Sequence, residues 1–324
     1  MFKKTYRNIF ISLMLTATLL TVLIVTLSSF IVSKMIYENY TAIAKQKFDR
    51  SILACKNYVN SVLLSVGNLA ANEDIILKVK TGQGDSVTNI LDNACSYALK
   101  INAITVYSAS GKIYSSSNIS GIPTLQMLEQ NSHLNDFFVL ETAEYVSLRT
   151  DNISSIYDQK PYSPQMGIVS CCRKIFDGSG NVAGYIFADI FPKTLYKYFS
   201  FSEDADFDKS IAYICFDDEF FISQSNLEFV PMFSNQNKEI AKSQDGNYLI
   251  LIGSRNFFGG TTKIAVPLYQ TKRTVALIIL LLIFSSAIIL ILVYFIAKKA
   301  AKKTDNRLEN LLKKMENAES RLID

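Results

Sequence analysis

Two long apolar runs stand out in the hydrophobic pattern of the chain. Residues 9–32 and 275–297 contain no charged side chain. At about 1.5 Å per helical residue, each run is long enough to cross roughly 30 Å of hydrocarbon. A cleaved signal peptide is the alternative for the first run, but the run exceeds the roughly 7–15 residues of a signal core and no Ala-x-Ala site closes it. The pattern therefore predicts two membrane-spanning helices.

A long amphipathic run follows the first predicted span. Its apolar residues recur at steps of three to five between polar ones: Ile36, Tyr40, Ile43, Phe48, Ile52, Cys55, Val59, Val62, Val66 and Leu69. This spacing predicts a helix over residues 33–72, about 55–60 Å long. A helical bundle is the alternative. Because the chain beyond the run is rich in strand patterns, we expect the helix to act as a spine for sheets.

Strand and helix patterns alternate between the spine and the second span. A hairpin is the clearest of them, with apolar arms at 167–176 and 182–190 around the turn-forming sequence Asp177-Gly178-Ser179-Gly180-Asn181. The other predicted elements are helices at 87–99, 124–130 and 192–199 and strands at 103–107, 113–117, 137–148, 211–216, 220–223, 248–253 and 263–268. An acidic break at 202–208 separates two groups of strands. The pattern indicates an α+β protein with two antiparallel sheets.

Positive charge predicts the orientation of the spans. Basic residues lie at the outer ends of both: Lys3, Lys4 and Arg7 before the first, and Lys298, Lys299, Lys302 and Lys303 after the second. Cytoplasmic flanks of membrane helices are rich in Lys and Arg, so we expect both termini inside and residues 33–273 outside. The outer segment carries 22 Lys and Arg against 24 Asp and Glu, so the net charge of +4 comes from the flanks. It matches anionic membrane lipid and not nucleic acid.

The chain lacks the common enzyme motifs. It contains no Walker loop, HExxH, GxSxG or zinc-spaced Cys pair. Its single histidine, His133, is expected outside, and residues 298–324 leave no room for a kinase domain. Asp204 opens a run resembling a calcium loop, but Lys209 and Cys215 stand where Gly and Glu are required. We therefore expect no enzyme, no cofactor and no metal site.

Cysteines and a heptad add two structural predictions. The five cysteines, Cys55, Cys95, Cys171, Cys172 and Cys215, are expected to be small buried apolar residues, with a Cys55–Cys95 disulfide as the alternative. Core heptad positions recur after the second span: Leu308, Leu311, Met315, Ala318 and Leu322. They predict a short coiled coil and hence a homodimer, with a helix lying on the membrane as the alternative.

The hairpin carries a family resemblance. The order Pro161-Tyr162, strand, Asp-x-x-Gly turn, strand with Gly184-Tyr185-Ile186 and then Asp189-Ile190 resembles the ligand-binding half of Cache extracytoplasmic sensor domains. The resemblance implies a double-Cache tandem on the spine helix. The implied segments are a cytoplasmic N-terminus at 1–8, a span at 9–32, a spine at 33–72, a membrane-distal Cache-like domain at 73–200, a membrane-proximal one at 201–273, a span at 275–297 and a cytoplasmic helical linker at 298–324.

Asp189 is the main candidate site residue. Alternation places it on the same strand face as Ala183, Tyr185 and Phe187. A buried carboxylate is costly without a partner, so either this face is open to solvent or Asp189 meets a cation or several donors. The alternative is that Asp189 caps the helix that begins near Pro192.

The resemblance also implies a ligand-binding set. In amine- and amino-acid-sensing Cache domains, a residue that resembles Asp189 receives the ligand's ammonium. Tyr162 would then line the pocket and Arg149 would bind a carboxylate, with Tyr185 and Tyr145 as further candidates. Because the chain has no Trp and lacks the Arg-x-aromatic-Tyr signature of amino-acid sensors, a cationic or polar small molecule is the expected ligand.

Together these features predict a membrane-anchored sensor. It would bind an extracellular small molecule and pass a conformational signal to a separate or missing output module, such as a kinase or another cytoplasmic signalling partner. Membrane lipid and a second copy of the chain are the other expected partners. The alternative is a structural or assembly protein of the envelope whose outer region binds another protein.

Overall fold

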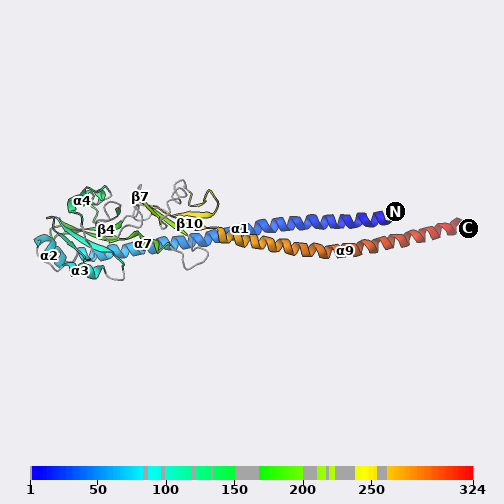
Figure 1. Cartoon of the computed structure of the whole chain (residues 1–324), viewed down its shortest axis with the longest axis horizontal. Coiled ribbons are helices and arrows are strands. Elements are labelled where there is room, and N and C mark those ends of the chain that lie inside the picture. Colours follow the sequence, from blue (N-terminus) through cyan, green and yellow to red (C-terminus); the bar gives the residue numbers. More distant parts are fainter. Residues whose placement is uncertain are drawn as a thin grey trace. The chain divides into compact units, whose positions relative to one another are not determined.

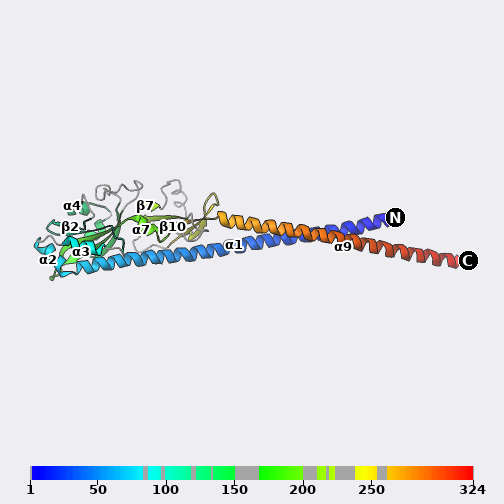
Figure 2. The same cartoon turned by 60° about the horizontal axis from the view of Figure 1, so that its bottom comes forward.

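The computed structural model describes residues 2–82, 87–95, 99–117, 122–132, 134–149, 168–199, 210–216, 219–222, 238–253 and 261–323 (Figures 1 and 2). The chain forms two compact units. One comprises Met1–Ala42 and Tyr269–Asp324, and the other comprises Ile43–Leu268. They are called the helical unit and the sheet unit below.

The helical unit contains both predicted spans. Helix α1 (Phe2–Ala70) includes residues 9–32, and helix α9 (Tyr269–Ile323) includes residues 275–297. Both helices are long and apolar enough to cross a membrane. Large apolar side chains point outward from both, for example Leu19 with 63% and Phe284 with 65% of its surface exposed. Apolar surface of this extent requires an apolar surrounding, so the unit fits a membrane protein.

The sheet unit contains two antiparallel sheets of five strands each. Sheet A comprises β1 (Ala103–Ser108), β2 (Ile113–Ser115), β3 (Glu144–Arg149), β4 (Ile168–Phe176) and β5 (Val182–Ile190). Sheet B comprises β6 (Ile211–Phe216), β7 (Glu219–Ile222), β8 (Ile240–Lys242), β9 (Tyr248–Ile252) and β10 (Thr261–Pro267). The orders are β2-β1-β5-β4-β3 and β7-β6-β10-β9-β8. If the strands of each sheet are numbered 1 to 5 in chain order, both sheets have the order 2-1-5-4-3.

The second half of α1 packs along both sheets. Its buried residues recur at steps of three and four, including Phe48, Cys55, Val59, Val62 and Val66, as the amphipathic pattern predicts. The prediction for Ile43 is wrong: it is exposed, and Ala44 is buried in its place. Two glycines lie where α1 closely approaches the sheets, because a side chain at either position would clash. A Cβ on Gly67 would lie 2.6 Å from the Arg173 guanidinium of β4, and one on Gly253, after β9, would lie 2.6 Å from Ile52.

Short helices complete the sheet unit. They are α2 (Glu73–Thr81), α3 (Val87–Ala94), α4 (Leu125–Glu129), α5 (Asn135–Val139) and α7 (Pro192–Tyr196). Helix α2, which the pattern did not predict, begins at an Asn72 side chain that accepts from the N–H groups of Asp74 and Ile75. It ends at Gly82, whose φ of 65° is left-handed.

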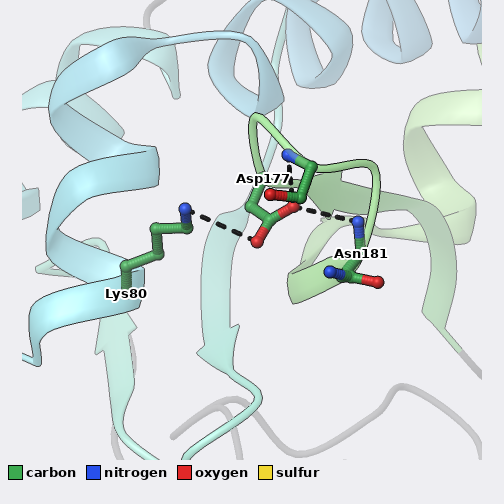
Figure 3. Close-up of polar contacts among 4 residues, drawn as sticks. Lys80, Asp177 and Asn181 are labelled. Carbon is green, nitrogen blue, oxygen red and sulfur yellow. Dashed lines mark hydrogen bonds and ion pairs between the residues drawn. The ribbon is translucent and has the colours of Figure 1, made fainter.

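An ion pair ties α2 to the turn between β4 and β5. Lys80 Nζ lies 3.5 Å from Asp177 Oδ2, while Asp177 Oδ1 accepts from the N–H groups of Ser179 and Asn181 (Figure 3). These two backbone bonds, Asn181 first, lower the pKa of Asp177 below its usual value, with Lys80 adding to the effect. Gly180 supplies the positive φ of 83° that the turn requires.

The strand predicted for residues 137–148 is partly wrong. Residues up to Val139 form α5, and β3 begins only at Glu144. Leu134 and Phe137, three residues apart, are both fully buried, and this spacing favours a helical turn. An apolar run this short does not distinguish helix from strand by itself.

Candidate functional site

The two faces of sheet A differ in what covers them. One face meets α1, because Arg173 approaches Gly67 of that helix. On the other face, Tyr107, Cys172 and Phe187 form a buried cluster with residues of the α4 and α5 region: Leu128, Leu134 and Phe137. Helix α4 accordingly lies on the side of sheet A opposite to α1 (Figures 1 and 2).

Aromatic rings fill one end of this second face. The Phe137 ring centroid lies 5.8 Å from those of both Tyr185 and Phe187 and 6.2 Å from that of Tyr145. Burial raises the pKa of the Tyr185 hydroxyl. This aromatic cluster is a packed core that fixes α5 on the sheet.

A row of small side chains crosses the other end of the face. Strand register aligns Ala103 of β1 with Asp189 of β5, Asp189 with Ser170 of β4, and Ser170 with Ser147 of β3. We call these four residues the Asp189 row. All four are buried. Residues paired across adjacent strands point to the same face, so the row places one carboxylate and two hydroxyls side by side.

Hydrogen bonds position Asp189 within the row. Its side chain is 3% exposed, and its Oδ1 accepts from the Ser170 hydroxyl at 2.5 Å. Its backbone oxygen accepts from the N–H of Asn102 at 2.8 Å. The Ser170 hydroxyl therefore fixes the orientation of the Asp189 carboxylate. Such a group, held in place and shielded from water, suits an ammonium or another group with several N–H donors.

The structure decides between the alternatives for Asp189. The face is not open to solvent at this residue, because Asp189 is buried and bonded to Ser170. The helix-cap alternative is wrong: Phe191 occupies the N-cap of α7, and Asp189 belongs to β5. Ser170 was not predicted as a site residue, because its place beside Asp189 depends on strand register.

The other predicted site residues are distributed over the same face. Tyr185 and Tyr145 belong to the aromatic cluster, and Tyr185 lies four residues from Asp189, about 13 Å along the strand. Arg149 is the last residue of β3, opposite Ile168, and its side chain lies outside the description. Tyr162, His133 and the Asp204 segment lie outside the described residues. The ligand-binding roles of these residues stay predictions.

Lys174 is a buried cation that the sequence did not reveal. It pairs with Tyr185 in the β4–β5 register and is 7% exposed. Its Nζ donates to the Leu140 carbonyl, at the end of α5, at 2.6 Å and lies 5.6 Å from the Phe137 ring centroid. Cations near a helix C-terminus are favourable, so Lys174 fastens α5 to β4.

Cys55, Cys171 and Cys172 are buried, as predicted, whereas Cys95 is partly exposed. Cys55, Cys95, Cys171 and Cys172 are all free, so the Cys55–Cys95 disulfide is absent. Cys171 and Cys172 lie on opposite faces of β4. Burial raises the pKa of Cys55 to about 12 and raises that of Cys171 as well. Both thiols are therefore neutral and unreactive.

No protein-family model matches the chain, and no curated protein matches it. Similar solved structures include the ligand-binding domain of Mlp24 with asparagine (TM-score 0.49, 15% identity, 74% of this chain and 99% of that one). Another is the ligand-binding domain of the Pseudomonas fluorescens chemoreceptor CtaA with L-serine (0.49, 13%, 72% and 98%). A third is the periplasmic sensory domain of the Campylobacter jejuni chemoreceptor Tlp1 (0.48, 13%, 73% and 98%). The first two are ligand-binding domains and the third is a sensory domain.

Proposed function

We propose that the chain is a membrane-anchored sensor whose double-Cache region binds a small molecule with an ammonium or another cationic group. The observation that carries the proposal is the buried carboxylate of Asp189, held by Ser170 in a row of small side chains. A buried carboxylate interacts more strongly with a cation than an exposed one does. Asp189 lies on the face of sheet A opposite to the face that contacts α1. A ligand bound at Asp189 would therefore not cover the contact between the sheet and α1.

Helix α1 is the element that would transmit binding. Its second half packs on the sheets, and the same uninterrupted helix contains the first apolar span. A ligand that favours one position of sheet A against α1 would displace the span, to the extent of its differential affinity for the two positions. Because α1 and α9 are neighbours in the helical unit, movement of α1 would shift α9. Helix α9 would then pass the signal to a cytoplasmic output module.

Both basic flanks lie at the same end of the helical unit. The rings of Phe10 in α1 and Tyr294 in α9 meet edge to face at 5.6 Å. The N-terminal part of α1 therefore lies beside the part of α9 that leads into the lysine-rich flank. This arrangement supports a topology with both termini in the cytoplasm and the sheet unit outside.

Ligand binding is the direct test of the site. In a thermal-shift screen of the Lys34–Arg273 fragment against small amines and their uncharged analogues, we expect amines to stabilise the fold. A ligand at 100 times its dissociation constant adds about 2.7 kcal/mol. Asp189→Asn keeps the side-chain volume but removes the charge, so it should weaken amine binding by about 2–5 kcal/mol.

The matched control for this test is Glu141→Ala. It removes one negative charge from an exposed position of the same domain and should leave amine affinity unchanged. Far-UV circular dichroism establishes that each variant is folded. Unchanged affinity of a folded Asp189→Asn variant for a stabilising amine would exclude the Asp189 row as its binding site.

A cysteine scan tests the membrane arrangement. Ser110 is exposed after β1, so a Cys placed there should react with a membrane-impermeant maleimide added to intact cells. A Cys at Ser320 should stay unlabelled. The parent chain measures the background from its own cysteines, of which Cys55, Cys171 and Cys172 are buried and Cys95 is partly exposed. Labelling at residue 320 without labelling at residue 110 would reverse the topology and remove the sensor function.

Cysteine cross-linking tests the homodimer that the heptad predicts. Met315 is 68% exposed in the single chain, although it occupies a heptad core position. A Cys at Met315 should cross-link to its copy faster than a Cys at Lys313, which lies off the seam and pairs with Glu309. Equal rates at the two positions would contradict the coiled coil.

A further inference from the structure

An apolar groove runs between the two helices of the helical unit. Its volume is about 510 Å³, and its lining includes Leu13, Ala17 and Leu20 of α1 and Ile296, Ala297 and Ala300 of α9. Sites for small molecules typically measure roughly 300–1,000 Å³. The one hydroxyl in the lining, that of Thr16, donates to the Ser12 carbonyl of its own helix at 2.7 Å. The lining is therefore apolar and suits an apolar molecule.

Basic side chains continue the α9 side of this groove. Lys299 and Lys303 follow Ile296 and Ala300 at three-residue steps, which places them on the same side of the helix one turn further on. Both are exposed, and neither forms an ion pair with any residue that the structure describes. Asp305, the first acid beyond the groove, is partly buried and follows groove-lining Ala297 and buried Ala301 at four-residue steps.

We propose that the groove binds one acyl chain of an anionic phospholipid of the cytoplasmic leaflet, whose phosphate lies against Lys299 and Lys303. The inference rests on the membrane topology proposed above. Charge selects this occupant. The exposed Lys299 and Lys303 attract an anionic headgroup, whose charge they neutralise.

Native mass spectrometry of the full-length chain in a nonionic detergent tests the site. We expect the chain to retain phosphatidylglycerol in preference to phosphatidylcholine of the same acyl composition. Lys299→Gln with Lys303→Gln should reduce phosphatidylglycerol affinity by about fivefold for each lysine. Lys313→Gln with Lys314→Gln removes the same charge further along α9, where both lysines are exposed, and should leave the affinity unchanged.

A second pair of substitutions tests the groove separately from the charges. Ala17→Leu with Ala300→Leu fills the groove with residues that favour helices and should abolish lipid retention with all lysines intact. Equal retention of the two lipids, equal loss in the two lysine variants, or full retention by the filled variant would each overturn the proposal. A change of oligomeric state in the filled variant would assign the groove to a second copy and overturn it as well. The cysteine scan reports topology independently, so failure of the lipid site is distinguishable from failure of the sensor function.

Discussion

Replacement of Phe137 by Ala should lower the free energy of unfolding of the sheet unit by about 3–5 kcal/mol. The Phe137 side chain is fully buried, and its ring contacts the rings of Phe138, Tyr145, Tyr185 and Phe187. Removing it leaves a cavity at the centre of the aromatic cluster. It also removes the ring over which the Lys174 ammonium lies. Urea unfolding of the Lys34–Arg273 fragment measures the loss.

Val139→Ala is the matched control in the same helix. Val139 is 72% exposed, so this substitution should change the free energy of unfolding by less than about 0.5 kcal/mol. Phe137→Leu should give an intermediate loss because Leu fills part of the space. A Phe137→Ala variant within about 1 kcal/mol of the parent would contradict the packing role of α5.

Replacement of Gly184 by Ala should cost about 1–3 kcal/mol or more, although alanine normally suits a strand better than glycine. An added Cβ would lie 2.3 Å from the Tyr107 carbonyl oxygen and 2.8 Å from Val79 Cγ1. The carbonyl belongs to the backbone of β1, which pairs with β5 at this position. The Tyr107 carbonyl cannot move away without disturbing the pairing of β1 with β5. Val79 of α2 occupies the space on the other side of the added Cβ.

Gly178→Ala is the control in the same hairpin. No atom lies within 4 Å of an added Cβ there, and its φ is not left-handed. Because alanine reduces the freedom of the unfolded chain, this variant should equal the parent or exceed it by about 0.4–1 kcal/mol. Thermal unfolding compares the two variants. A Gly184→Ala protein as stable as the Gly178→Ala protein would show that the β1–β5 contact adapts without cost.

Local pattern was sufficient for the hairpin that bears the candidate site. The turn residues from Asp177 to Asn181 bracket two apolar arms, and β4 and β5 begin and end within one residue of the predicted positions. The same local information failed for residues 137–148, where the four consecutive apolar residues at 137–140 are compatible with either a helical or a strand period. Tertiary packing against Phe187 and Tyr185 selected the helix there.

The sequence by itself determined the two apolar spans, the spine helix, most strands and the presence of an acid on an otherwise apolar strand face. Each of these depends on side chains that are neighbours along the chain. Only the tertiary structure decided that Ser170 and Ser147 lie beside Asp189, and that Lys174 fastens α5. Those neighbours are set by the register between strands far apart in sequence. Register follows from burying whole faces of a sheet at once, a condition that no short stretch of sequence records.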